Sequence, residues 1–133
     1  MPPPINYVAT ITVDDTKAKG SQISVDPPTI ETAPDLHVVF VVRNVGNDTH
    51  KVSIDRDLFQ KKPGSPPNAP DTPITFFGKH FDHVDAGDVG AIILRMKNKR
   101  DYGGDPTGTR YPYKYTIEAS GLDDYDPDIG INN

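Results

Sequence analysis

Residues 36–42 read Leu-His-Val-Val-Phe-Val-Val, and this stretch decides the fold class. Valine favours extended backbone, and a run that is apolar on both faces indicates a strand in the middle of a sheet or between two sheets. A turn-rich segment at residues 44–48 follows, and residues 49–55 alternate between apolar and polar, as the second strand of a hairpin would. Residues 89–96 (Val-Gly-Ala-Ile-Ile-Leu-Arg-Met) are the second strongly apolar run. Together these segments predict the central strands of a β-sandwich.

The composition of the 133-residue chain supports an all-β fold. Val and Ile together occur 22 times and Thr 11 times, against four Leu, seven Ala and two Glu, and there are 14 Pro and 11 Gly. β-Branched residues favour strands and Pro and Gly favour turns, so a helical bundle is excluded. Short runs of strand-like residues separated by turns predict about seven to nine strands in an antiparallel Greek-key β-sandwich. We expect one domain over residues 1–133, with flexible ends at residues 1–4 and 132–133.

Residues 37–52 resemble the cupredoxin pattern, in which a buried strand ends in an Asn, a turn follows, and a His precedes a short hydrophobic strand. The turn at residues 84–87 before the apolar run, and the strand at residues 113–117 before residues 126–129, are similar to later parts of that family. The resemblance extends over residues 36–131 and implies a cupredoxin-like sandwich. An immunoglobulin-like sandwich accounts for the same strands.

The copper chemistry of the cupredoxins does not carry over to this chain. Their blue-copper sites use two His, one Cys and usually an axial Met. His50 stands where the first His would be, but the chain contains no Cys, and neither Met1 nor Met96 is placed for axial ligation. The resemblance therefore implies the fold without the electron-transfer site.

Two groups of side chains are candidate metal ligands. Imidazole and carboxylate suit Zn²⁺ or Cu²⁺, and His80, Asp82 and His83, together with His50, offer both if the 80–83 segment is irregular. The second group matches the first three ligand positions of a calcium loop, although it lacks the glycine and the final glutamate of such loops; it consists of Asp124, Asp126 and Asp128. Exposed turn residues are the simpler interpretation of both groups, so we expect no cofactor.

Charge and motifs exclude several classes of function. A formal net charge of −5 argues against nucleic-acid binding. The densest basic cluster, an anion-binding candidate or a solvated loop, consists of Lys97, Lys99 and Arg100. No apolar run reaches the ~20 residues of a membrane span. There is no signal peptide in the sequence, so we expect a cytoplasmic protein, or an exported one from which the signal has been removed. No serine lies in a nucleophile-elbow motif, so an enzyme of unrecognised type is the weaker alternative.

The expected function is that of a non-catalytic binding module for a protein or a small ligand. Recognition on a sandwich is usually carried by loops, and the two long loops here are residues 61–73, with five prolines, and residues 97–110. Three tyrosines at residues 111, 113 and 115 share one face of the next strand, which we interpret as core. Tyr111 is nearest the loop and is the candidate for contact with a ligand.

Overall fold

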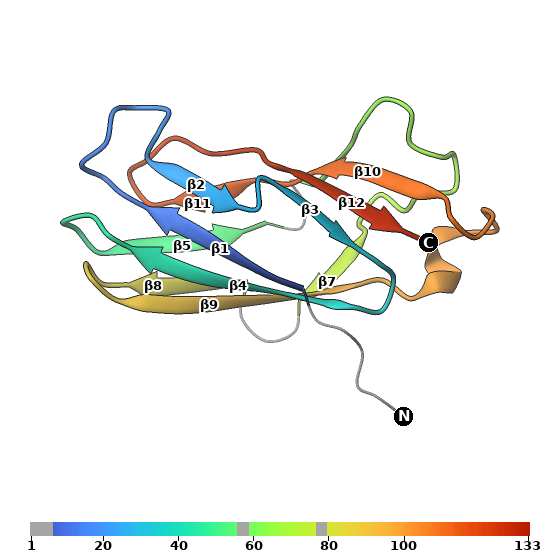
Figure 1. Cartoon of the computed structure of the whole chain (residues 1–133), viewed down its shortest axis with the longest axis horizontal. Helices are drawn as coiled ribbons and strands as arrows, with labels where there is room; N and C mark the ends of the chain where they lie inside the picture. The colour runs from blue at the N-terminus through green and yellow to red at the C-terminus, as the bar shows by residue number, and fades with distance from the viewer. Residues whose placement is uncertain (1–6, 56–58, 77–79) are drawn as a thin grey trace.

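The computed structural model describes residues 7–55, 59–76 and 80–133. Within them, twelve strands and one short 3₁₀-helix follow each other along the chain (Figure 1). The strands are β1 (Tyr7–Val13), β2 (Ile23–Asp26), β3 (Thr29–Thr32), β4 (His37–Asn44), β5 (His50–Ile54), β6 (Gln60–Lys61), β7 (Ile74–Phe76), β8 (Phe81–Val84), β9 (Val89–Met96), β10 (Arg110–Lys114), β11 (Ile117–Ala119) and β12 (Asp128–Asn132).

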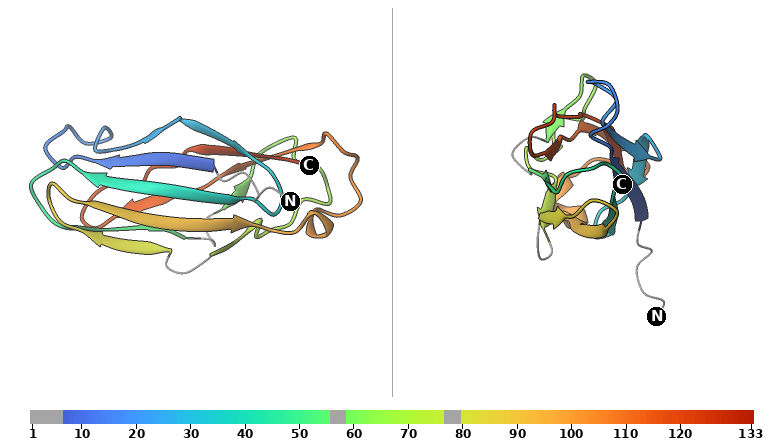
Figure 2. Two further views of the ribbon diagram at one scale, coloured as in Figure 1. Left: turned by 60° about the horizontal axis from the view of Figure 1, so that its bottom comes forward. Right: turned by 90° about the vertical axis from the view of Figure 1, so that its left-hand side faces the viewer.

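These strands form a two-layered sandwich. One layer is a five-stranded sheet in the order β2-β1-β4-β9-β7. The other layer consists of a four-stranded sheet, β3-β12-β10-β6, and a three-stranded sheet, β11-β5-β8. Residues 110–119 supply β10 to one of these smaller sheets and β11 to the other, so the chain itself joins them. Seen from the end, the strands surround a common interior (Figure 2). The expected all-β sandwich is confirmed.

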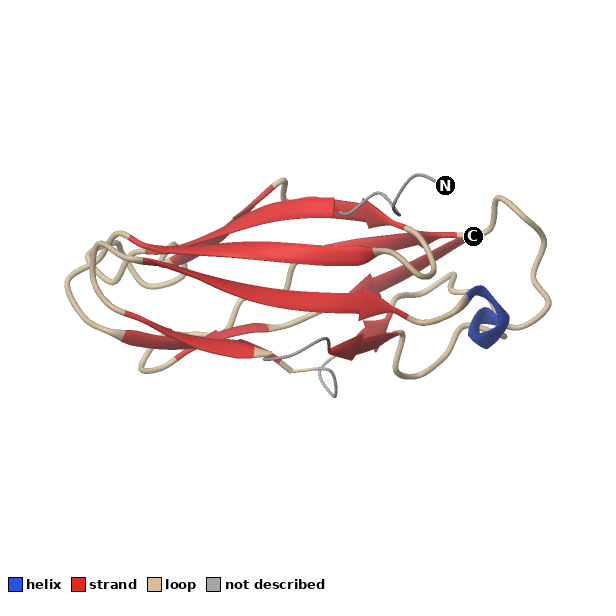
Figure 3. Cartoon of the chain, turned by 90° about the horizontal axis from the view of Figure 1, so that it is seen from below, coloured by secondary structure: helices blue, strands red, loops and turns tan. Residues whose placement is uncertain are grey.

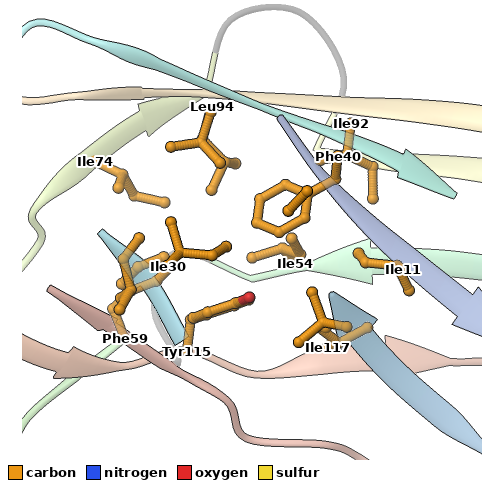
Figure 4. Close-up of a cluster of buried hydrophobic side chains, with 14 of the residues drawn as sticks. Ile11, Ile30, Phe40, Ile54, Phe59, Ile74, Ile92, Leu94, Tyr115 and Ile117 are labelled. Atoms are coloured by element: carbon orange, nitrogen blue, oxygen red, sulfur yellow. The ribbon is translucent and has the colours of Figure 1, made fainter. Parts of the chain in front are cut away.

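The core lies between the layers and contains the inward-facing residues of both. Val38, Phe40 and Val42 of β4 are fully buried, whereas Val39 and Val41 on the other face are half-buried. Phe40 meets Tyr115 of the opposite layer with 5.8 Å between ring centroids. Figure 4 shows how isoleucines from several strands converge around these two rings. β4 is central in its sheet, as expected, but only one of its faces is fully buried.

Two strand pairs differ from the expected antiparallel pairing. β1 pairs with β4 in parallel, and β3 pairs with β12 in parallel. Both arise because the chain leaves the five-stranded sheet at its edge strand β2 and enters the opposite layer at its edge strand β3. This change of layer also divides one extended segment into two short strands, which is one reason why there are more strands than the predicted seven to nine.

The C-terminal residues, expected to be flexible, are hydrogen-bonded in the structure. Asn132 is the last residue of β12, the backbone N–H of Asn133 donates to the carbonyl of Thr109 at 2.9 Å, and Gly108 donates to the carbonyl of Asn133 at 2.8 Å. Residues 1–4, the other expected flexible end, lie outside the described residues.

Within residues 7–55, 59–76 and 80–133, helix is confined to η2 (Lys99–Tyr102), at one end of the sandwich beside several loops (Figure 3). No helix in the part of the chain that the structure describes is long and apolar enough to cross a membrane.

Candidate binding site

The two long loops singled out in the sequence lie together at one end of the sandwich (Figures 1 and 2). The backbone N–H of Lys97 donates to the carbonyl of Pro73 at 3.0 Å, and Asn68 donates through Nδ2 to Asp105 at 3.3 Å. Gly103, with φ of +71°, approaches Asn68 so closely that a Cβ atom would collide with it. We call this surface, residues 61–73 and 97–110, the loop platform.

Three buried tyrosines hold the loop platform in place from below. The hydroxyl of Tyr102 donates to the carbonyl of Pro73 at 2.8 Å, and that of Tyr113 donates to the carbonyl of Pro70 at 2.8 Å. The hydroxyl of Tyr111 lies 2.9 Å from the carbonyl of Tyr102. All three side chains are fully buried, and burial raises the pKa of Tyr111 to about 12, so its hydroxyl stays protonated. The prediction that Tyr111 contacts a ligand directly is therefore wrong: its ring supports the loops instead.

The exposed part of the loop platform combines prolines with charges of both signs. Lys99 and Arg100 lie exposed on η2, and Arg100 is 3.9 Å from Asp101. Lys97 is half-buried, and its backbone is hydrogen-bonded to the other loop. Only Lys99 and Arg100 of the predicted basic cluster are therefore exposed on the surface. On the other loop, Lys61 pairs with Asp71 at 3.1 Å. The platform thus presents mixed charge rather than a uniformly positive patch.

Replacing Tyr113 with phenylalanine tests whether its hydroxyl supports the platform. Tyr113→Phe should lower the free energy of unfolding by about 1 kcal/mol, because the half-buried carbonyl of Pro70 loses its donor. Tyr115→Phe is the matched control: its buried hydroxyl has no hydrogen-bond partner among the described residues, so its removal should leave stability equal or higher. Urea unfolding measures both, and amide exchange near residue 70 should accelerate only in Tyr113→Phe. Equal losses in the two variants would contradict this role.

The structure does not bring the candidate histidine ligands together. β5 pairs with β8 so that His50 is opposite Val84 and His83 is opposite Lys51, which places His50 inward and His83 on the other face. His80 and His83 are exposed and each lies against Phe81, with ring centroids 5.2 and 6.0 Å away. Asp82 accepts a hydrogen bond from the backbone of Ala91. In the described ranges, no three His, Cys, Asp or Glu side chains are grouped as metal ligands.

Two of the three aspartates in the calcium-loop pattern have side-chain partners of their own. Asp126 accepts a hydrogen bond from the hydroxyl of Thr116 at 2.6 Å. Asp128 lies 3.1 Å from the ammonium of Lys62, whose hydrogen bond lowers the pKa of the Asp128 carboxyl, and 3.5 Å from that of Lys114. Asp124 is exposed in the preceding turn. Asp126 and Asp128 thus contact different side chains, Thr116 and the two lysines.

His50 belongs to a polar cluster at the end of the sandwich away from the loop platform. Its Nδ1 lies 2.9 Å from the carbonyl of Ser120, and its Nε2 lies 2.8 Å from Oδ2 of Asp15. Asp15 also accepts hydrogen bonds from the backbone of Asn47 and Asp48, each at 2.9 Å. These contacts lower the pKa of Asp15, with the N–H of Asn47 the largest cause. We call Asp15, His50 and the carbonyl of Ser120 the His50 clamp.

The His50 clamp was not predictable from local sequence. His50 was singled out as a metal ligand, but Asp15 is 35 residues away and lies in an ordinary Asp-Asp turn. The clamp joins the β1–β2 loop, the β4–β5 turn and the segment after β11. It leaves both ring nitrogens of His50 engaged with oxygen atoms of the protein.

The fold defines the chain as a β-sandwich of the immunoglobulin-like or cupredoxin-like kind. No family model matches the sequence, and no curated protein matches it. Among solved structures, the Pseudomonas aeruginosa CupB2 chaperone superimposes with a TM-score of 0.58 at 9% identity, over 80% of this chain and 53% of that one. The PapD-like domain 7 of human CEP192 gives 0.51 at 8% identity, over 80% of both chains.

A multicopper oxidase is also similar in structure. McoA of Aquifex aeolicus gives a TM-score of 0.52 at 14% identity, over 96% of this chain and 30% of that one. The neighbours thus include both kinds of sandwich that the sequence suggested. This chain spans about half of the CupB2 chaperone, at 53%, and less than a third of McoA, at 30%. At these identities the similarity shows the fold alone.

Proposed function

We propose that this chain is a non-catalytic protein-binding module and that the loop platform is its recognition surface. The observation that carries the proposal is the support under the platform: Tyr102 and Tyr113, both fully buried, donate hydrogen bonds to the carbonyls of Pro73 and Pro70. Loops held in one conformation lose less conformational entropy when they bind a partner. Buried tyrosines that fix exposed loops are therefore what a binding surface on a rigid scaffold requires.

The exposed residues of the platform favour a protein partner. Prolines are already restricted in conformation, and Lys99, Arg100 and Asp101 offer charges of both signs at its rim. The structural neighbours support this choice, since one is named as a chaperone and another as a PapD-like domain, although the similarity transfers no partner to this chain. A metal-binding role has no comparable support, because the candidate ligands are separated within the described residues.

Site-specific photo-crosslinking in the cells that produce the protein tests the proposal. Benzoylphenylalanine is placed at Pro67 or at Thr107, which are exposed on the two loops, and at Lys17, an exposed control at the opposite end. We expect one protein, identified by mass spectrometry, to be crosslinked from both loop positions and not from Lys17. Its purified form should then bind the wild type at least about tenfold more tightly than the Lys99→Glu/Arg100→Glu variant.

Crosslinks at Lys17 alone, or no crosslink at any position, would overturn the assignment of the loop platform. Equal affinity of the purified partner for wild type and charge-reversed variant would do the same. Circular dichroism and the urea midpoint of each variant establish that it is folded before the comparison is made.

A further inference from the structure

The outer face of the five-stranded sheet has a group of apolar side chains in the middle of its three longest strands, beside the outward-facing Thr10, Thr12 and Arg95. The register aligns Val8 of β1 with Val39 of β4 and Ile93 of β9 in one row. The next outward row contains Val41 and Ala91. Val8 is 59% exposed, and the flanking Val89 is 62% exposed. We call this surface, made by Val8, Val39, Val41, Ala91 and Ile93, the apolar face.

The opposite layer has a charged outer surface, which makes the apolar face distinctive. Arg110 and Glu31 form a two-pronged ion pair, with Nε to Oε1 at 2.6 Å and Nη2 to Oε2 at 3.1 Å. This pair lies against Gly130, where a Cβ atom would collide with both side chains. Lys114 and Asp128 continue the same polar surface. A group of adjacent apolar side chains on an outer face that is otherwise polar is typical of a surface that a partner covers.

Two unpaired charges flank the apolar face, one of each sign. Asp26 is exposed at the end of β2, level with Thr10 of β1, and Arg43 is exposed on β4, level with Thr12 of β1. Neither has an ion pair with any residue in the described part of the chain. Asp26 and Arg43 are separated by two strand spacings of ~4.8 Å across the sheet and by two residues of ~3.4 Å along the strands. The diagonal distance between them is about 12 Å.

We propose that two copies of this chain pack through their apolar faces, with Asp26 of each copy against Arg43 of the other. Consider a twofold axis that lies in the plane of the interface along the midline between these residues, perpendicular to the line that joins them. Rotation about this axis places Asp26 of one copy over Arg43 of the other. On the strand lattice, that midline passes between Val39 and Val41, near the centre of the apolar face. A single twofold axis therefore joins both ion pairs and also brings apolar residues against apolar residues, as an isologous interface requires.

The size of the face sets the strength of this association. In sheet order the five strands have 4, 7, 8, 8 and 3 residues, and at ~3.4 Å by ~4.8 Å per residue they cover roughly 500 Å² per copy. About 1,000 Å² in total is below the standard size of specific interfaces, so the dimer should be weak and dependent on concentration. The loop platform is at the end of the sandwich, outside this face, and stays accessible in the dimer.

Charge exchange, followed by sedimentation equilibrium on the full chain, tests the proposal. The wild type should associate reversibly as a dimer. Arg43→Asp or Asp26→Arg alone should raise the dissociation constant of the dimer by about tenfold or more. An equimolar mixture of the two variants should restore it to within about threefold, since each copy then offers the charge that the other lacks. Lys17→Asp, an exposed control with the same charge change at the end of the sandwich, should have no effect.

Rescue by mixing also shows that the single variants are folded. A wild type that stays monomeric to millimolar concentration would overturn the proposal. Loss of association in both single variants without rescue in the mixture would overturn the Asp26–Arg43 arrangement. Val39→Lys, at the centre of the apolar face, should abolish the dimer, and a dimer that persists in this variant would place the interface elsewhere.

Discussion

Replacing Ile92 with alanine should lower the free energy of unfolding by about 3 kcal/mol, whereas Ile93→Ala at the next position should lower it by only about 1 kcal/mol. The two side chains are chemically identical and adjacent in β9. Ile92 is fully buried between the layers, and Ile93 points to the apolar face and is half-buried. A cavity opened in a packed core is only partly closed by relaxation of its surroundings, while truncation at the outer face leaves no enclosed void.

Urea unfolding of both variants at micromolar concentration, below the range in which a weak dimer forms, measures this difference. Leu94→Ala, on the same inward face, serves as a second buried example and should resemble Ile92→Ala. If Ile92→Ala and Ile93→Ala lost equal stability, both faces of β9 would have to be covered within a single chain. That result would contradict the apolar face as an available surface.

Replacing His50 with alanine should lower the free energy of unfolding by about 2–3 kcal/mol. The buried imidazole contacts Asp15 and the carbonyl of Ser120, at 2.8 and 2.9 Å. It thereby links the β1–β2 loop, the β4–β5 turn and the segment after β11 at one end of the sandwich. Its removal leaves a space at this end of the sandwich and takes one partner from the carbonyl of Ser120 and one from Oδ2 of Asp15, which keeps only the N–H of Asp48. Amide hydrogen exchange should accelerate around residues 45–48 and 120, with little change in the loop platform. Uniform acceleration over the whole chain would contradict a local role.

The Asp15 side of the His50 clamp should appear as sensitivity to acid. Because the pKa of Asp15 in the folded protein is below its ordinary value of 3.8, the unfolded chain takes up the proton first as the pH falls. The stability that Asp15 contributes is therefore complete above about pH 4 and is lost as the pH falls through the lowered pKa. Asp15→Asn should show a smaller decline in stability over this range. Part of the decline should remain, since the pKa of Asp128 is lowered as well.

These expectations assign separate roles to the parts of the sandwich. The His50 clamp secures one end, the loop platform occupies the other, and the apolar face lies along the side formed by β1, β4 and β9. A partner bound at the loop platform and a second copy bound at the apolar face would not compete. The Lys99→Glu/Arg100→Glu and Arg43→Asp variants can therefore be used independently to test the two surfaces.

The fold class and the position of the long loops were determined by the sequence alone. β-Branched residues in short runs, divided by prolines and glycines, have few alternatives to a sandwich, and five prolines in residues 61–73 prevent a regular strand there. Alternation showed the inward face wherever the other face was polar, as in β1, where Thr10 and Thr12 face outward. These are local properties, because they depend only on which residues follow one another.

Which face of β9 enters the core, what supports the loops, and what binds His50 were decided only by tertiary structure. Ile92 and Ile93 are both apolar and point to opposite faces of β9, so the sequence pattern does not show which of them faces the core. The pairing of β9 with β4 and β7 decides this. Tyr111 looked accessible because it follows a loop, yet η2 and Asp105 fold over its hydroxyl. His50 meets Asp15 across 35 residues of chain, because the parallel pairing of β1 with β4 places the turns that follow these two strands side by side. Contacts between distant segments depend on strand order and register, which no short stretch of residues encodes.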